Sequence, residues 1–172
     1  MIWNRKCGIR TKAFLLFMSL FVSGCVYAAG TQAATNEPAS AKGSLNLDIN
    51  YPGIGLRYFF SGSAALELRG QYEKDTTVGG ARLYLFPGSF KKEGIVPYFG
   101  LEGDYGSFKG ENSKGNGYAG GVFGGLEYFL GRSLSVQTDA GASYLSLKDK
   151  ETSLTQSGLE FILNLGINIY FK

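Results

Sequence analysis

The sequence predicts an all-β fold, an eight-stranded antiparallel up-and-down transmembrane barrel, from three features. Over residues 156–171 the apolar side chains fall on every second position. The same alternation recurs from residue 44 onward, interrupted by turn residues. Beyond the N-terminal region no apolar run is long enough for a membrane helix. Because alternate side chains of a strand lie on opposite faces, each segment has an apolar face for lipid and a polar face for a lumen.

Residues 1–28 have the layout of a secretory signal peptide: a basic start, the apolar run 13–22, and then small residues. The segment Val26-Tyr27-Ala28 predicts cleavage before Ala29. A lipoprotein is the alternative, because Val22-Ser23-Gly24-Cys25 resembles a lipobox in which Cys25 would carry the lipid. An uncleaved anchor is a third possibility, although the run is short for one.

Residues 29–43 are small, polar and without periodicity, which predicts a flexible periplasmic tether before a barrel over 44–172. Either cleavage removes Cys7, and Cys25 is then lost or lipidated, so no disulfide is expected. Four basic residues lie in the first twelve positions, which leaves 13 basic residues against 14 acidic ones. This balance excludes a nucleic-acid-binding protein, because no basic excess survives processing.

The first four predicted strands span 44–51, 54–60, 64–73 and 76–86. Each has an apolar row opposite polar residues. The rows are Leu45, Leu47, Ile49 and Tyr51; Ile54, Leu56, Tyr58 and Phe60; Leu66, Leu68 and Tyr72; and Ala81, Leu83 and Leu85.

The last four predicted strands span 95–106, 116–129, 133–145 and 156–171. Their apolar rows are Phe99, Leu101 and Tyr105; Tyr118, Val122, Leu126 and Tyr128; Leu134, Val136, Ala140 and Tyr144; and Leu159, Phe161, Leu163, Leu165, Ile167, Ile169 and Phe171.

The apolar row changes parity across Pro52-Gly53, which fits either a tight turn between two strands or a bulge within one. Connection lengths favour the turn. The polar connections 107–115 and 147–156 are long, and 130–132 is short. Outer-membrane barrels place long loops outside and short turns in the periplasm, with an even strand count. A turn at Pro52-Gly53 gives eight strands and places both barrel termini in the periplasm.

With this threading the outward aromatic residues form two belts, as expected at the two membrane interfaces. The extracellular belt is Tyr51, Tyr72, Tyr105, Tyr118 and Tyr144, and the periplasmic belt is Tyr58, Phe60, Tyr128 and Phe171. A soluble barrel or sandwich with its apolar face turned inward is the alternative. Its outer face would need more charge than the polar rows supply.

The polar rows bring ionisable residues into the lumen, which predicts a lumen ionic network. Its members are Arg57, Arg69, Arg82, Asp48, Glu67, Glu102, Asp104, Glu127, Asp139 and Glu160. An eight-stranded barrel is only wide enough for its side chains to fill, so these charges must be paired or hydrated. The network either packs the core or, alternatively, forms a narrow gated pore in which arginines exchange acidic partners.

No enzymatic activity, cofactor or metal is expected. The chain contains no histidine, which excludes Ser-His-Asp and Cys-His catalysis and the usual imidazole metal sites. Residues 115–120 match G-x-G-x-x-G, but a dinucleotide site needs a strand before the glycines and a helix after them. Here a polar loop precedes the glycines and an alternating strand follows. Glu102 and Asp104 are more simply partners for the lumen arginines than a proton-sharing pair.

Over residues 44–172 the chain resembles the small outer-membrane barrel proteins, the porin-like family that includes the OmpA transmembrane domain and OmpX. The resemblance rests on the repeated hairpins, on residues 125–129 (GLEYF) and on the aromatic C-terminal strand. It implies location in the cell outer membrane, with outer-membrane lipid and the barrel assembly machinery as partners. The family's chains usually end in an aromatic residue read by that machinery. Here Phe171 is followed by Lys172.

The predicted function is that of a non-enzymatic outer-membrane barrel with a structural or cell-surface interaction role, whose polar loops would contact an unknown surface ligand. A narrow pore or a barrel that transports small molecules or lipid is the alternative, and a soluble ligand carrier is the third hypothesis.

Overall fold

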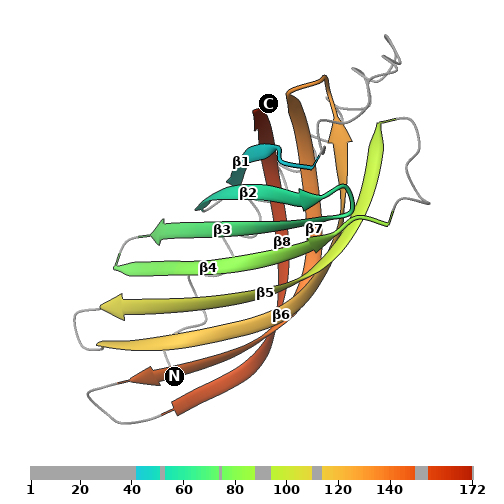
Figure 1. The fold of residues 1–172 in the computed structure, drawn as a ribbon. Coiled ribbons are helices and arrows are strands. Elements are labelled where there is room, and N and C mark those ends of the chain that lie inside the picture. The colour runs from blue at the N-terminus through green and yellow to red at the C-terminus, as the bar shows by residue number, and fades with distance from the viewer. Residues whose placement is uncertain are drawn as a thin grey trace, which may run out of the picture. The chain divides into compact units, whose positions relative to one another are not determined.

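Eight antiparallel strands form a closed barrel in which each strand pairs with the next in the chain and β8 pairs with β1 (Figure 1). This computed structural model describes residues 42–50, 53–73, 75–87, 94–109, 114–149 and 155–171. The strands are β1 (Leu45–Asn50), β2 (Gly53–Ser61), β3 (Ala64–Glu73), β4 (Thr76–Leu85), β5 (Ile95–Lys109), β6 (Lys114–Phe129), β7 (Leu134–Asp149) and β8 (Thr155–Phe171). The predicted up-and-down barrel is confirmed. No helix in these ranges is long and apolar enough to cross a membrane.

The parity change at Pro52-Gly53 corresponds to a turn between separate strands. Asn50 of β1 pairs directly with Gly53 of β2, and the two strands run antiparallel from there. The irregularity in this region lies elsewhere, between β2 and β3, where the register shifts between Phe59 and Ser61. On the same side of the barrel, between β3 and β4, Asp75 has a φ of 70°.

The strands β5 to β8 are longer than the alternation of apolar residues indicates. The predicted loops 107–115 and 147–156 are strand at both of their ends, since β5 continues to Lys109 and β7 to Asp149. Residues 110–113 and 150–154 between these ends lie outside the described ranges. These extensions consist mainly of glycine, polar and charged residues, so they lack the apolar row from which strands were predicted. Their backbones nevertheless stay paired, with Lys109 opposite Lys114. Backbone pairing, which requires no particular side chain, extends the sheet here.

The strand register advances by ten residues in one circuit of the barrel. Successive paired residues lead from Leu45 around the sheet to Phe161 of β8, whereas β1 closes the barrel by pairing Leu45 with Phe171. A stagger of this kind corresponds to strands tilted by roughly 40° and to an interior that side chains fill. The interior of this barrel is therefore a packed core.

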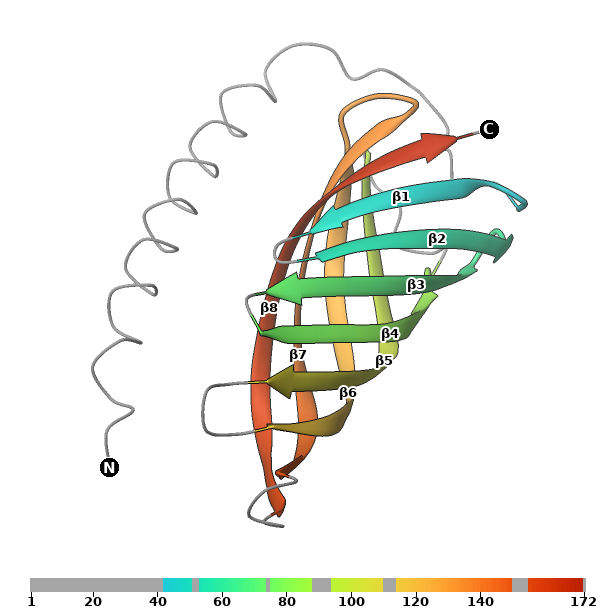
Figure 2. The same cartoon turned by 90° about the vertical axis from the view of Figure 1, so that its left-hand side faces the viewer.

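Among the described residues, the same stagger leaves the first half of β8 with one strand neighbour. β1 pairs only with Gly166–Phe171, the end of β8 that lies beside it in Figure 2. Thr155–Leu165 continues alongside β7. The backbone N–H of Tyr170 donates to the carbonyl of Ser133 at 2.9 Å. Since strand hydrogen bonds alternate sides, even-numbered residues of β8 bond toward β7 and odd-numbered ones point away from it.

Candidate functional site

The candidate functional site is the barrel interior, where inward-facing charged residues of different strands meet. Arg57 of β2 is fully buried and lies among carboxylates of three other strands. Its Nη2 atom is 2.9 Å from Glu67 Oε2 and 3.5 Å from Asp48 Oδ2, and its Nη1 atom is 3.7 Å from Glu127 Oε2. The same Nη2 donates to Gln137 Oε1 at 2.8 Å. One guanidinium thus connects β1, β2 and β3 with β6 and β7 across the lumen.

Two further arginines form a second group beside the first. Arg82 of β4 lies 2.7 Å from Glu102 Oε2 and 3.4 Å from Asp139 Oδ2. Arg69 of β3 shares Glu102 at 3.4 Å and reaches Asp104 at 3.9 Å. The two groups contain nine of the ten predicted lumen residues.

Neutral side chains donate hydrogen bonds to the carboxylates, which outnumber the arginines in the lumen. Gln137 donates to Asp48 Oδ2 at 2.7 Å, Asn164 to Asp139 Oδ1 at 2.7 Å, and Asn168 to Glu127 Oε1 at 3.0 Å. The hydroxyls of Ser135 and Tyr170 also donate to Glu127 Oε1. A buried charge is very costly unless it is paired and hydrogen-bonded. The amides and hydroxyls therefore belong to the site as much as the ionised groups do.

Glu160 is the predicted lumen residue that the structure does not bring to an arginine. Its side chain has inward parity on β8 but is exposed, and the residue lies opposite Ser143. Asp139, which does contact Arg82, lies opposite Asn164, four residues farther along β8. Glu160 is thus beyond the arginine level, in the part of β8 that extends past β1.

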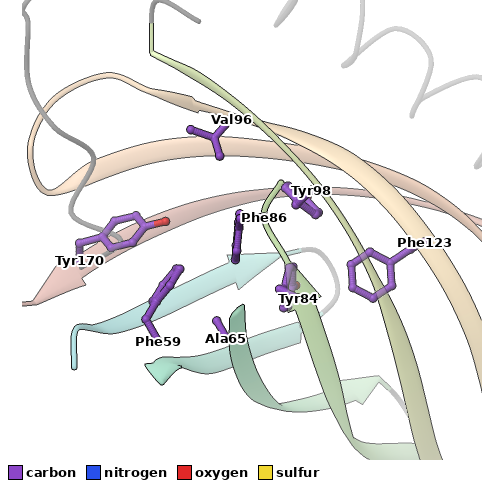
Figure 3. Close-up of a cluster of buried hydrophobic side chains, with 8 residues drawn as sticks. All are labelled: Phe59, Ala65, Tyr84, Phe86, Val96, Tyr98, Phe123 and Tyr170. Carbon is purple, nitrogen blue, oxygen red and sulfur yellow. The ribbon is translucent and has the colours of Figure 1, made fainter. Parts of the chain in front are cut away.

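An aromatic cluster fills the interior toward the barrel end at which Leu45 pairs with Phe171. Arg57 lies over the Tyr84 ring at 3.8 Å and Arg82 over the Phe123 ring at 4.6 Å, distances typical of cation–π contacts. Figure 3 shows the cluster, whose buried members are Phe59, Ala65, Tyr84, Phe86, Val96, Tyr98, Phe123 and Tyr170.

This cluster was not predicted, because aromatic residues were assigned only to the outward belts. The information was present in the parity of the strands. Phe59 lies between the outward residues Tyr58 and Phe60, and Tyr84 lies between Leu83 and Leu85. An aromatic residue at an inward position beside arginines could have been assigned to the core.

The outward aromatic residues lie at two levels of the outer surface. Tyr118 and Tyr128 are ten residues apart on β6, which is roughly 25 Å along the barrel axis at this tilt. All predicted belt residues within the described ranges are exposed: Tyr72, Tyr105, Tyr118, Tyr144, Tyr58, Phe60, Tyr128 and Phe171. Tyr51 lies outside these ranges, as do Cys25, the predicted signal peptide and all of the predicted tether before Lys42.

The other sequence motifs form no site of their own. Gly115, Gly117 and Gly120 lie within β6, where a strand continues in place of the helix that a dinucleotide site requires. Across the described ranges no group of three or more His, Cys, Asp and Glu residues is placed to hold a metal ion.

Comparison with solved structures identifies a barrel of the same fold. The chain is similar to the crystal structure of the N-terminal beta-barrel domain of Pseudomonas aeruginosa OprF, with a TM-score of 0.53 and 14% sequence identity. The alignment covers 76% of this chain and 98% of that domain. The fold of this chain is that of a small eight-stranded barrel. No family model and no curated protein matches the sequence.

Proposed function

We propose that the chain is a non-enzymatic outer-membrane β-barrel with a structural or cell-surface interaction role. The observation that carries the proposal is the distribution of charge between the two faces of the strands. On the described strands every carboxylate and every arginine has inward parity. The outward face between the two aromatic levels carries no charge, as expected of a surface in contact with lipid.

The interior supports a structural role over conduction. Arg57 reaches from β2 to Glu127 on β6 and Gln137 on β7, so its ion pairs cross the lumen. Aromatic rings pack next to it, with Tyr84 and Phe123 at 5.1 Å between ring centroids. An ion would have to displace paired, buried side chains to pass this level. The barrel therefore stabilises itself through these contacts and offers its strand ends for interaction.

Refolding into lipid vesicles tests the membrane location. We expect unboiled protein to migrate differently from boiled protein on a denaturing gel, and the vesicles to protect the barrel from trypsin. A boiled and unboiled band at the same position, with full digestion by trypsin, would favour the soluble alternative.

Planar-bilayer recordings test the role of the interior. The wild-type protein should give no steady conductance, and Arg82→Ala should lower the thermal midpoint. A stepwise conductance in the wild type that Arg82→Ala alters would instead support the pore, because that residue links Glu102 to Asp139.

The interaction role is tested at the strand ends. The connections 110–113 and 150–154 join the four longest strands, β5 to β6 and β7 to β8, and are the surfaces proposed to meet an external ligand. Replacing both with short Asn-Gly turns should preserve the barrel's heat-modifiable migration and reduce attachment of expressing cells to surfaces or host cells. Unchanged attachment would argue for a purely structural role.

A further inference from the structure

Three neighbouring strands repeat the same pair of outward residues. On β5, β6 and β7 an outward tyrosine is followed, four residues nearer the extracellular end, by an outward lysine. The pairs are Tyr105 with Lys109, Tyr118 with Lys114, and Tyr144 with Lys148. All six side chains are exposed. These lysines are the only charged residues with outward parity on the described strands.

The strand register brings the three pairs together on one patch. Tyr105 lies directly opposite Tyr118, and Lys109 directly opposite Lys114. Lys148 lies opposite Asn116, two residues from Lys114 along β6. Like charges directly opposite each other on one sheet face are destabilising. No carboxylate with outward parity lies on the described strands to offset this repulsion. Asp75, an exposed residue in the turn before β4, borders the patch, since its carbonyl accepts a hydrogen bond from the Lys109 backbone N–H at 2.8 Å. The three lysines outnumber this carboxylate, so the patch has the net positive charge of an anion-binding surface.

The level of the lysines indicates which anion they meet. Four residues of a tilted strand advance roughly 10 Å along the barrel axis, so the lysines lie about that far beyond the tyrosine belt. Tyrosine rings lie at the level of the lipid headgroups and long lysine side chains extend from there into the polar layer. Phosphate groups of a membrane lipid are the anions at this level.

We propose that Lys109, Lys114 and Lys148 bind the phosphate groups of a phosphorylated glycolipid in the outer leaflet, with Tyr105, Tyr118 and Tyr144 packing on its sugar and acyl boundary. The proposal rests on the proposed outer-membrane location and orientation. A patch three strands wide fits a bulky headgroup with more than one phosphate better than a single-phosphate lipid. Each lysine acts as a compact positive charge with several N–H donors.

The test compares the wild type with the variant Lys109→Gln/Lys114→Gln/Lys148→Gln in phosphatidylcholine vesicles with and without lipid A. Lys42→Gln/Lys91→Gln/Lys92→Gln is the control, because it removes the same charge from segments on the predicted periplasmic side. We expect lipid A to raise the thermal midpoint of the wild type and of the control. Its apparent affinity for the patch variant should fall on the order of fivefold for each lysine removed.

Equal affinity of the patch variant and the wild type for lipid A would overturn the proposal. Equal stabilisation by phosphatidylglycerol vesicles would also overturn it, since any anionic lipid would then suffice. Inorganic phosphate that reproduces the full stabilisation would show a site for free anion instead of glycolipid. Heat-modifiable migration and trypsin protection in the same vesicles separate these outcomes from failure of the membrane location itself.

Discussion

At the scale of single residues, Arg57 shows how strongly the interior depends on matched charges. Its side chain is fully buried and is the shared partner of Asp48, Glu67 and Glu127. Removing one member of a buried ionic group leaves the others desolvated and without compensation. Mutations that break the pairing should therefore cost more than mutations that remove charge from both sides.

Arg57→Met is expected to lower the free energy of unfolding by about 3–5 kcal/mol, because three carboxylates lose their shared counter-ion. Adding Glu67→Gln to this variant should recover part of the loss, since it removes one of the stranded charges. Urea titration in detergent micelles, followed by far-UV circular dichroism, measures both. A double variant less stable than Arg57→Met would show that Glu67 contributes mainly through other contacts.

Two adjacent glycines of β6 illustrate close packing on one face only. A Cβ added to Gly125 would lie 2.7 Å from both Asp139 Cβ and Tyr98 Cζ, and would also collide with the carbonyl of Thr138. A Cβ added to Gly124 would meet only the Tyr98 carbonyl, at an ordinary 3.7 Å. The room for an added Cβ therefore differs between these two neighbouring glycines, because one faces the lumen and the other faces outward.

Gly125→Ala should therefore destabilise the barrel by about 1–3 kcal/mol through overpacking, while Gly124→Ala serves as its matched control with little effect. Samples of each variant are heated to graded temperatures before electrophoresis. The measurement is the temperature at which the band of the folded protein disappears. Equal shifts for the two variants would contradict the inward packing of Gly125.

At the scale of the elements, one half of β8 pairs with two strands of the described chain and the other half pairs with one. Gly166–Phe171 pairs on both sides, whereas Thr155–Leu165 pairs with β7. The direction of the Tyr170 N–H assigns even-numbered residues of β8 to the β7 ladder. Loss of the backbone N–H should therefore lower the stability by different amounts at consecutive residues in the first half of β8.

Proline substitution tests this alternation at two exposed neighbours, Glu160 and Phe161. Glu160→Pro should cost on the order of 1–3 kcal/mol, because the carbonyl opposite it on β7 loses its donor. Phe161→Pro should cost less, since the described part of the chain places no strand on the side to which that N–H points, and proline is tolerated at such edge positions. Urea midpoints in detergent compare them. The reverse order would mean that the open side of β8 is hydrogen-bonded and the β7 side is not.

At the scale of the whole molecule, the barrel is an inverted arrangement of polar and apolar residues. Charged residues such as Arg82 are buried inside, while Leu68 is 64% exposed and Phe161 86% exposed on the outside. In water this distribution would be unfavourable, because large apolar surfaces would be hydrated. A lipid environment reverses the balance and makes the outer surface favourable.

A charge placed on the outer face should therefore cost more at mid-height than near the strand end. Leu101→Arg is expected to destabilise the barrel in lipid vesicles by about 2–4 kcal/mol, and Ser107→Arg on the same face of β5 by about 0–1 kcal/mol. Guanidinium titration in vesicles measures both. Similar small costs would place Leu101 outside the hydrocarbon layer.

Much of the barrel could be predicted from alternation because a strand has a fixed two-residue side-chain period. The period identified β1 to β8 and assigned Arg57, Glu67 and Arg82 to the interior. It could not locate strand ends such as Lys109 and Lys114, where backbone pairing continues without an apolar row.

The sequence by itself determined which face each side chain takes and how many strands the barrel has, since both follow from local periodicity and turn residues. Only the tertiary structure decided which inward residues meet. The ten-residue stagger sets the levels at which strands lie opposite each other, and pairing between distant strands fixes it. For this reason Arg57 meets Glu127 on the far side of the lumen, Glu160 lies beyond every arginine, and Lys109 and Lys114 come to lie side by side.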